Sequence, residues 1–283
     1  MKKVNCCDGI YNSLDVHFTS LCDNKCGHCI DLKYDGVGIP KPDVHAIYNT
    51  IKENAEGVDD VLFLGGEPCL FLKELLECIK LIQTNTHLKV FVTTSIPKTC
   101  YDQKDLFYEL IDLVDGINLS VQHHNEQIAD QIRRTKSRYD RQKFYWELPN
   151  KNKIRINLNI VKPFLFTKED ITACLSHYDK MGFNSIKLSE IQHGKACFVS
   201  FEKVFGIRMK SPYSHGCQTY LNMEDTIEGF QAPLLLKRSC FACEETLKPS
   251  VSDGIKVVGK LFSFSSNKYG IVYEDGTLMK GWV

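Results

Sequence analysis

The sequence lacks an excess of charge and lacks a long apolar run. Its 35 lysine and arginine residues balance 35 aspartate and glutamate residues, so net charge gives no support for binding to nucleic acid or to a membrane surface. No stretch approaches the roughly 20 apolar residues of a membrane-spanning helix. Two lysines stand at the N-terminus with no apolar run behind them, unlike a signal peptide. We therefore expect a cytoplasmic protein with no membrane partner.

Cysteine, in contrast, is abundant, with 13 residues in a chain of 283. Cytoplasmic thiols stay reduced, so this number favours metal ligation over disulfides. Four of the cysteines, Cys69, Cys78, Cys100 and Cys174, fall within helix or loop patterns and are most simply interpreted as small apolar side chains.

Strand patterns alternate with amphipathic helix patterns through the first two-thirds of the chain. The six predicted strands cover residues 13–18, 59–64, 88–95, 116–122, 153–161 and 184–191, and helices are predicted between them at residues 43–54, 72–84, 103–114, 125–134 and 167–182. Apolar strands that alternate with helices are typical of a parallel sheet covered by helices. Six units predict an α/β fold of the partial (β/α)6 TIM-barrel type, with chemistry on the loops that follow the strands.

The pattern changes near residue 200. Prolines and glycines interrupt the chain, and a hairpin is predicted to turn at Asp275 and Gly276. We therefore predict two units, a barrel over residues 1–199 and a small α+β auxiliary domain over residues 200–283.

Three cysteines lie close together in the loop after the first predicted strand. Cys22, Cys26 and Cys29 form a C-x3-C-x2-C pattern. A [4Fe-4S] cluster normally takes four thiolates, so three would leave one iron open for chemistry. The alternative is a zinc ion with His28 or His17 as fourth ligand, although this spacing is unusual for structural zinc.

A second motif, "GGEP", follows the second predicted strand and contains Gly65, Gly66, Glu67 and Pro68. Together the two motifs resemble the radical S-adenosylmethionine (SAM) superfamily, and the resemblance covers about residues 13–195. It implies that the three cysteines hold a [4Fe-4S] cluster whose open iron is chelated by SAM. It also implies that backbone carbonyls of the "GGEP" segment and Glu67 hydrogen-bond the amino group of SAM.

Polar residues at four further strand ends are candidates for the same site. Thr94, Ser120, Gln122, Asn157 and Asn159 are predicted to contact SAM or to line its cavity, and Glu190 is the candidate catalytic residue. Glu190 has an alternative role as an ion-pair partner of Lys187 or Lys195. His123, His124 and His193 are interpreted as loop residues.

A second cysteine group lies in the C-terminal third. Cys217, Cys240 and Cys243 resemble the short auxiliary-cluster extensions of twitch or SPASM type, which hold a second [4Fe-4S] cluster. Cys197 is a conceivable fourth ligand. Two alternatives stay open, namely a zinc ion with His215 as fourth ligand and cysteines without a metal.

Family membership implies reductive cleavage of SAM to methionine and a 5′-deoxyadenosyl radical, which abstracts a hydrogen atom from the substrate. It also implies a one-electron donor such as flavodoxin or ferredoxin. We expect the substrate to be a peptide or protein side chain, as in the modification of ribosomal peptides. The alternatives are the same chemistry on a small molecule or nucleotide, and a non-catalytic zinc or iron–sulfur binding module.

Overall fold

One large mixed sheet organises the computed structural model, which describes residues 13–29, 41–136, 138–191, 194–206, 208–209, 220–222, 229–237, 239, 257–258, 260–261 and 269–279. The sheet has eleven strands in the order β11-β8-β9-β6-β5-β4-β3-β2-β1-β12-β13. Its centre consists of the parallel strands β1 (Ser13–Thr19), β2 (Asp60–Gly65), β3 (Lys89–Thr94), β4 (Gly116–Val121), β5 (Ile154–Ile160) and β6 (Ser185–Glu190). This arrangement confirms the predicted α/β fold.

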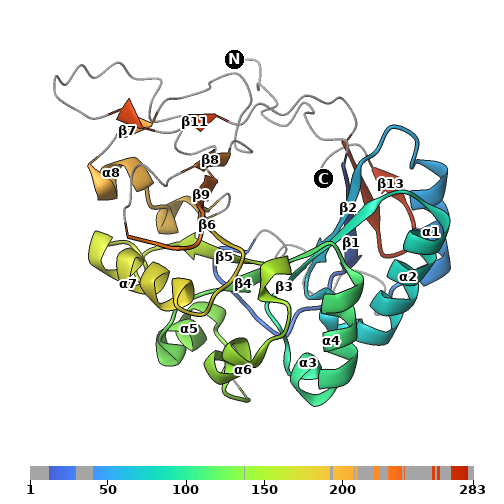
Figure 1. Cartoon of the computed structure of the whole chain (residues 1–283), viewed down its shortest axis with the longest axis horizontal. Coiled ribbons are helices and arrows are strands. Elements are labelled where there is room, and N and C mark those ends of the chain that lie inside the picture. Colours follow the sequence, from blue (N-terminus) through green and yellow to red (C-terminus); the bar gives the residue numbers. More distant parts are fainter. Residues whose placement is uncertain are drawn as a thin grey trace.

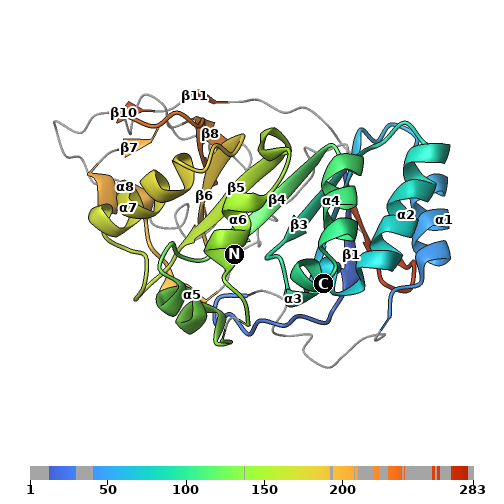
Figure 2. The same cartoon turned by 60° about the horizontal axis from the view of Figure 1, so that its bottom comes forward.

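Helices surround the outer side of the curved sheet (Figure 1). They are α1 (Val44–Glu53), α2 (Leu72–Asn85), α3 (Lys98–Asp102), α4 (Lys104–Leu113), α5 (Glu126–Arg133), α6 (Arg141–Glu147), α7 (Lys168–Asp179) and α8 (Phe201–Phe205). Figure 2 shows α1 and α2 side by side at one end of this layer. None of the described helices has the length and hydropathy that crossing a bilayer requires.

The hydrophobic core lies between the sheet and these helices. In β5, the buried residues Ile154, Ile156, Leu158 and Ile160 alternate with more exposed residues. Successive strand side chains point to opposite faces, so the alternate positions, which include Asn157 and Asn159, face away from the helices. The predicted common direction of these two asparagines agrees with this pattern.

Capping residues fix where several helices begin. Asp43 caps α1, and Thr167 caps α7 by accepting a hydrogen bond from the backbone N–H of Asp170 at 3.1 Å. This confirms the predicted start of α7. Helix α6 was not predicted, because its short sequence lies in a charged segment that we interpreted as a connection.

Strands from the C-terminal third join both edges of the central sheet. The strand β9 (Leu234–Lys237) pairs with β6, and β12 (Tyr269–Tyr273) pairs with β1, both in parallel. β12 also forms the predicted hairpin with β13 (Leu278–Met279). β8 (Tyr220–Asn222) and β11 (Lys260–Leu261) extend the β9 edge, and β7 (Arg208–Met209) pairs with β10 (Val257–Val258). The division near residue 200 stays a prediction.

Candidate active site

The three N-terminal cysteines lie in a short loop that directly follows β1. Cys22 is exposed and Cys26 and Cys29 are partly exposed, and none of the three forms a disulfide with a described residue. A tight turn, closed by a 3.0 Å bond from Cys29 N to Cys26 O, brings two of the cysteines around one bend. The loop therefore presents three thiols without burying them.

Helix α5 holds this loop in place from one side. The backbone N–H of Lys25 donates to the carbonyl oxygen of Arg133 at 2.8 Å, and the hydroxyl of Thr135 donates to the carbonyl oxygen of Asp23 at 3.1 Å. The loop is thus attached to the C-terminal end of the helix that follows β4.

The diglycine turn after β2 holds the loop from the other side. Gly66 N donates to Thr19 O at 2.7 Å, and Glu67 N donates to Leu21 O at 2.8 Å. A Cβ atom on Gly66 would overlap the carbonyl oxygen of Leu21 and lie 2.7 Å from its carbonyl carbon. Only glycine permits this approach. The two sequence motifs are therefore joined by their backbones.

The side chain of Glu67 is directed into the protein and is 2% exposed. One carboxylate oxygen accepts hydrogen bonds from the hydroxyl of Thr94 at 2.6 Å and from Cys69 N at 3.2 Å. The other accepts two bonds from Ser95, from its N–H and its hydroxyl, each at 2.7 Å. Burial raises the pKa of Glu67, and the three bonds from Thr94 and Ser95 oppose that shift.

These contacts occupy the Glu67 carboxylate within the chain, and its predicted contact with SAM stays a prediction. A carboxylate that already accepts four bonds from its own chain has no lone pair directed at a ligand. The main-chain carbonyls of the turn remain as acceptors for an ammonium group. Glu67 and Thr94 therefore position the turn.

Asn24 links the cysteine loop to the end of β3. Its amide nitrogen donates to the hydroxyl of Ser95 at 2.9 Å, and its backbone N–H lies 3.4 Å from the sulfur of Cys22. Asn24 was not predicted as a site residue, because an asparagine between two cysteines is also an ordinary loop residue.

Two predicted polar residues offer buried oxygen atoms on neighbouring strands. Ser120 of β4 stands opposite Asn157 of β5 in the parallel register, and Gln122 directly follows β4. The side-chain oxygens of Asn157 and Gln122 are buried and accept no hydrogen bond from the residues that the structure describes. A buried polar atom without a partner is costly, so these oxygens are suited to contact a polar ligand.

The last predicted asparagine reaches the cysteine loop itself. The amide nitrogen of Asn159 lies 3.4 Å from Nε2 of His28. Burial, followed by the nearby charge of Arg134, lowers the pKa of His28 to about 4, so this imidazole is neutral at pH 7. The guanidinium of Arg134 packs on Gly27, where a Cβ atom would lie 2.6 Å from it. The sequence analysis missed Arg134, whose signal was the basic pair at the predicted end of helix 125–134.

The C-terminal hairpin adds a carboxylate to this region. Glu274 lies 3.2 Å from Nδ1 of His17 and accepts a 3.2 Å bond from the hydroxyl of Ser20. His17 in turn packs close to Gly65, where a Cβ atom would lie 3.2 Å from its ring. Glu274 was missed because the sequence does not reveal that β12 lies beside β1.

Glu190, the candidate catalytic residue, is the last residue of β6. It is 1% exposed, and its two carboxylate oxygens accept hydrogen bonds from Phe201 N at 2.9 Å and Ser239 N at 2.8 Å. These contacts attach two segments that follow the barrel. These contacts give Glu190 a structural role, and its catalytic role stays a prediction.

The second cysteine group cannot be placed in the fold. Cys217, Cys240 and Cys243 lie outside the described residues, as do His193 and His215. Cys197 is described and is a partly exposed, free thiol at the end of a short 3-10 turn (Lys195–Cys197).

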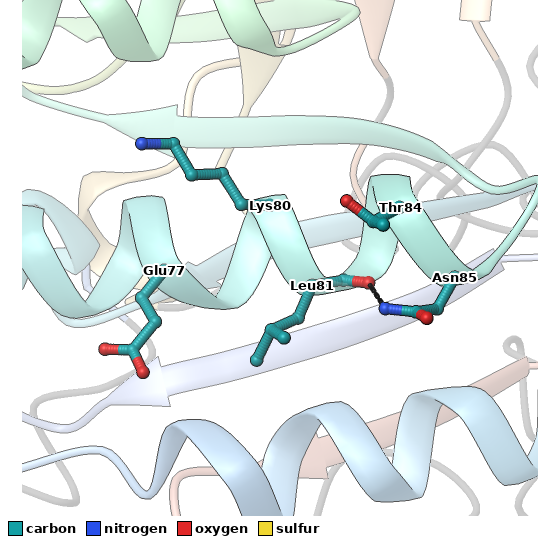
Figure 3. Close-up of a pocket in the computed structure, with 5 residues that line it drawn as sticks. All are labelled: Glu77, Lys80, Leu81, Thr84 and Asn85. Atoms are coloured by element: carbon teal, nitrogen blue, oxygen red, sulfur yellow. Dashed lines mark hydrogen bonds between the residues drawn. The ribbon is translucent and has the colours of Figure 1, made fainter.

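Figure 3 shows the residues of α2 that line a surface pocket. They are Glu77, Lys80, Leu81, Thr84 and Asn85. The amide of Asn85 is bonded to the carbonyl oxygen of Leu81 on the same helix at 2.8 Å. This pocket contains no predicted site residue, and we assign it no function.

Comparison with known proteins identifies the family. The model of the Radical SAM superfamily matches residues 16–172, more than half of the chain. The chain belongs to the radical SAM superfamily. No curated protein matches the sequence significantly.

Solved structures of the protein SuiB share the fold of the chain. SuiB from Streptococcus suis aligns with a TM-score of 0.58 at 15% identity, over 95% of this chain and 60% of SuiB. The structure of SuiB bound to S-adenosylmethionine aligns with a TM-score of 0.57 at 14% identity, over 95% of this chain and 60% of SuiB. The structure of SuiB bound to the precursor peptide SuiA aligns with a TM-score of 0.55 at 12% identity, over 95% of this chain and 59% of SuiB. This chain thus spans about 60% of the length of SuiB.

A [4Fe-4S] cluster and SAM are typical of the radical SAM superfamily, and the residues present fit them. Three cysteine thiols stand in one loop, which leaves a fourth iron without a cysteine from that loop. The loop is joined to a glycine turn, and the buried oxygens of Asn157 and Gln122 are left to accept hydrogen bonds.

Proposed function

We propose that the chain is a radical SAM enzyme in which Cys22, Cys26 and Cys29 hold a [4Fe-4S] cluster. When bound, the cluster supplies the electron that cleaves SAM into methionine and a 5′-deoxyadenosyl radical, which takes a hydrogen atom from the substrate. The observation that carries this proposal is the pair of backbone hydrogen bonds from Gly66 and Glu67 to the cysteine loop. These bonds fix the turn beside the thiols.

The remaining residues of the site are proposed to bind and orient SAM. Carbonyl groups of Gly65, Gly66 and Pro68 are positioned by the buried carboxylate of Glu67 to accept from the amino group of SAM. The oxygens of Asn157 and Gln122 are available for the ribose hydroxyls, with Ser120 and Asn159 beside them.

The C-terminal third is proposed to form an auxiliary unit of twitch or SPASM type over residues 200–283. Its ligands would be Cys217, Cys240 and Cys243, which would hold a second [4Fe-4S] cluster, with Cys197 as a candidate fourth ligand. The cysteine spacing supports this proposal, and so does the alignment with SuiB over 95% of this chain.

We propose that the substrate is a peptide or protein side chain. The support is the structural likeness to SuiB, one of whose structures contains the precursor peptide SuiA. A one-electron donor of the flavodoxin or ferredoxin type would reduce the cluster. The second candidate, the same chemistry on a small molecule or nucleotide, keeps the same site and changes only the substrate.

The test is anaerobic reconstitution with iron and sulfide, followed by metal analysis and chromatography of 5′-deoxyadenosine. Two clusters predict about eight irons per chain. Cys26→Ala is expected to remove about four irons and all SAM cleavage. The control is Cys78→Ala, in a fully buried cysteine of α2, which should keep both.

Three outcomes would change the proposal. Normal SAM cleavage in Cys26→Ala would refute the site. About four irons, together with zinc that is lost in Cys240→Ala, would make the C-terminal cysteines a zinc site. A wild-type chain that binds iron but never cleaves SAM, with peptide or small molecule added, would be a non-catalytic binding module.

A further inference from the structure

A second group of metal-binding residue types lies outside the proposed SAM site. His123 and His124 follow β4, and Cys174 lies on α7. Each offers one ligand atom, and these atoms lie within 4.8 Å of one another. His123 and Cys174 are buried, and His124 is partly exposed. The sequence alone suggested two loop histidines and an apolar cysteine, because about 50 residues separate them.

Direct contacts tie the group together. Nδ1 of His124 lies 3.0 Å from the sulfur of Cys174. The rings of His123 and His124 stack with centroids 4.5 Å apart, and the ring of His177 lies 5.5 Å from that of His124. Three imidazoles and one thiol therefore meet where the loop after β4 contacts α7.

Helix α7 brings its polar residues to one side. Cys174 and His177 are three residues apart, and Asp170 precedes Cys174 by four, so all three lie on one face. Nε2 of His177 lies 3.0 Å from the side-chain oxygen of Gln142. An oxygen acceptor places the proton on Nε2 and leaves the lone pair on Nδ1. Metal-binding histidines typically have such a partner for their second nitrogen.

We propose that this group is a second metal site, which binds a zinc-type divalent ion through Cys174, His124 and at least one of the flanking imidazoles. Sulfur and imidazole nitrogen are the ligands that zinc prefers. Two such ligands of one tetrahedral zinc ion lie about 3.6 Å apart. The observed 3.0 Å pair must therefore open by about half an ångström, which a small side-chain rotation achieves.

The two flanking imidazoles, those of His123 and His177, differ in the change that metal binding would require of each. Nδ1 of His123 accepts the N–H of Asn125 at 2.9 Å, so its lone pair is occupied. His123 lies closer to the other ligand atoms but must give up that bond, whereas His177 has its lone pair available. Burial lowers the pKa of His123 to about 4, and it also lowers the pKa of His124 and of His177.

A metal here would stabilise the start of α5. That helix begins at Glu126, two residues after His124, and its other end holds the cysteine loop through the carbonyl of Arg133. The proposed ion is therefore a structural one that acts at a distance from the SAM site. The proposal does not depend on the reaction of the enzyme.

The experiment measures zinc in the anaerobically reconstituted full chain, dialysed against a weak chelator, by mass spectrometry. Cys174→Ser and His124→Gln are expected each to contain about one zinc less per chain than the wild type, with at least about tenfold weaker zinc affinity. Iron content should stay unchanged. The matched controls, Cys78→Ser and His87→Gln, alter a buried cysteine and an exposed histidine elsewhere, and they should keep the wild-type zinc content.

Thermal unfolding gives a second readout. Added Zn²⁺ should raise the midpoint of the wild type and of both controls, but not that of His124→Gln. His123→Gln and His177→Gln identify the completing ligand, and at least one should lose zinc. Equal zinc in the wild type, Cys174→Ser and His124→Gln would overturn the proposal. Unchanged zinc in both His123→Gln and His177→Gln would also overturn it, because two protein ligands do not make a structural site.

Discussion

Replacement of Gly66 by alanine tests the close contact between the diglycine turn and the cysteine loop. The added Cβ atom would overlap the carbonyl oxygen of Leu21, which is a backbone atom and cannot rotate away. The turn must move outward, and this movement weakens the bonds from Gly66 N to Thr19 O and from Glu67 N to Leu21 O. Two such bonds contribute about 1 kcal/mol each, and overpacking adds about 1–3 kcal/mol. We expect a loss of about 4 kcal/mol.

The assay combines urea unfolding, iron content and formation of 5′-deoxyadenosine. Gly182→Ala is the control, because a Cβ atom there meets nothing within 4 Å and only the positive φ of +76° opposes it. That strain costs about 1 kcal/mol and should leave the iron content unchanged. The reasoning about backbone contact would be refuted if Gly66→Ala matched this control in stability and kept wild-type iron and SAM cleavage.

Three carboxylates provide further predictions. Glu67→Gln turns an amide N–H₂ toward donors such as Ser95, so it should lower the free energy of unfolding by about 2–3 kcal/mol and should also lower iron retention. Urea unfolding measures the first effect, and an unchanged unfolding midpoint would contradict it. Glu190→Gln should cost about 1–3 kcal/mol but leave 5′-deoxyadenosine formation per folded chain unchanged, and a tenfold fall in that rate would restore its catalytic role. Burial alone raises the pKa of Glu274, but the hydrogen bond and charge of His17 hold it below its ordinary value of 4.5. The stabilising contribution of Glu274 is therefore present above about pH 4.5 and is lost as the pH falls through the lower folded pKa. Unfolding measured across this pH range should show that Glu274→Gln is less stable than the wild type at neutral pH and equally stable in acid.

Local patterns predicted much of the central fold, because each unit buries its own apolar face. The alternation in β5 and the Thr167 cap of α7 are both local features. What the sequence did not reveal depends on contacts between distant segments. β12 lies beside β1, more than 250 residues away, and no spacing rule indicates this pairing. The same limit explains why Glu274 and Arg134 were missed and why Cys174 was interpreted as an apolar filler.

The two strand-end glutamates show why residue type alone does not assign a role. Glu67 and Glu190 both lie at or just beyond the carboxyl end of a parallel strand, where catalytic residues collect, and both resembled ligand-binding groups in the sequence. In the fold, both are buried and accept backbone N–H groups. The two carboxylates differ in the segments that they bind. Glu190 attaches segments that follow the barrel, whereas Glu67 holds Ser95, which receives the side chain of Asn24 from the cysteine loop. Loss of either carboxylate lowers stability, but only loss of Glu67 loosens the loop that carries the thiols, so iron retention separates the two roles.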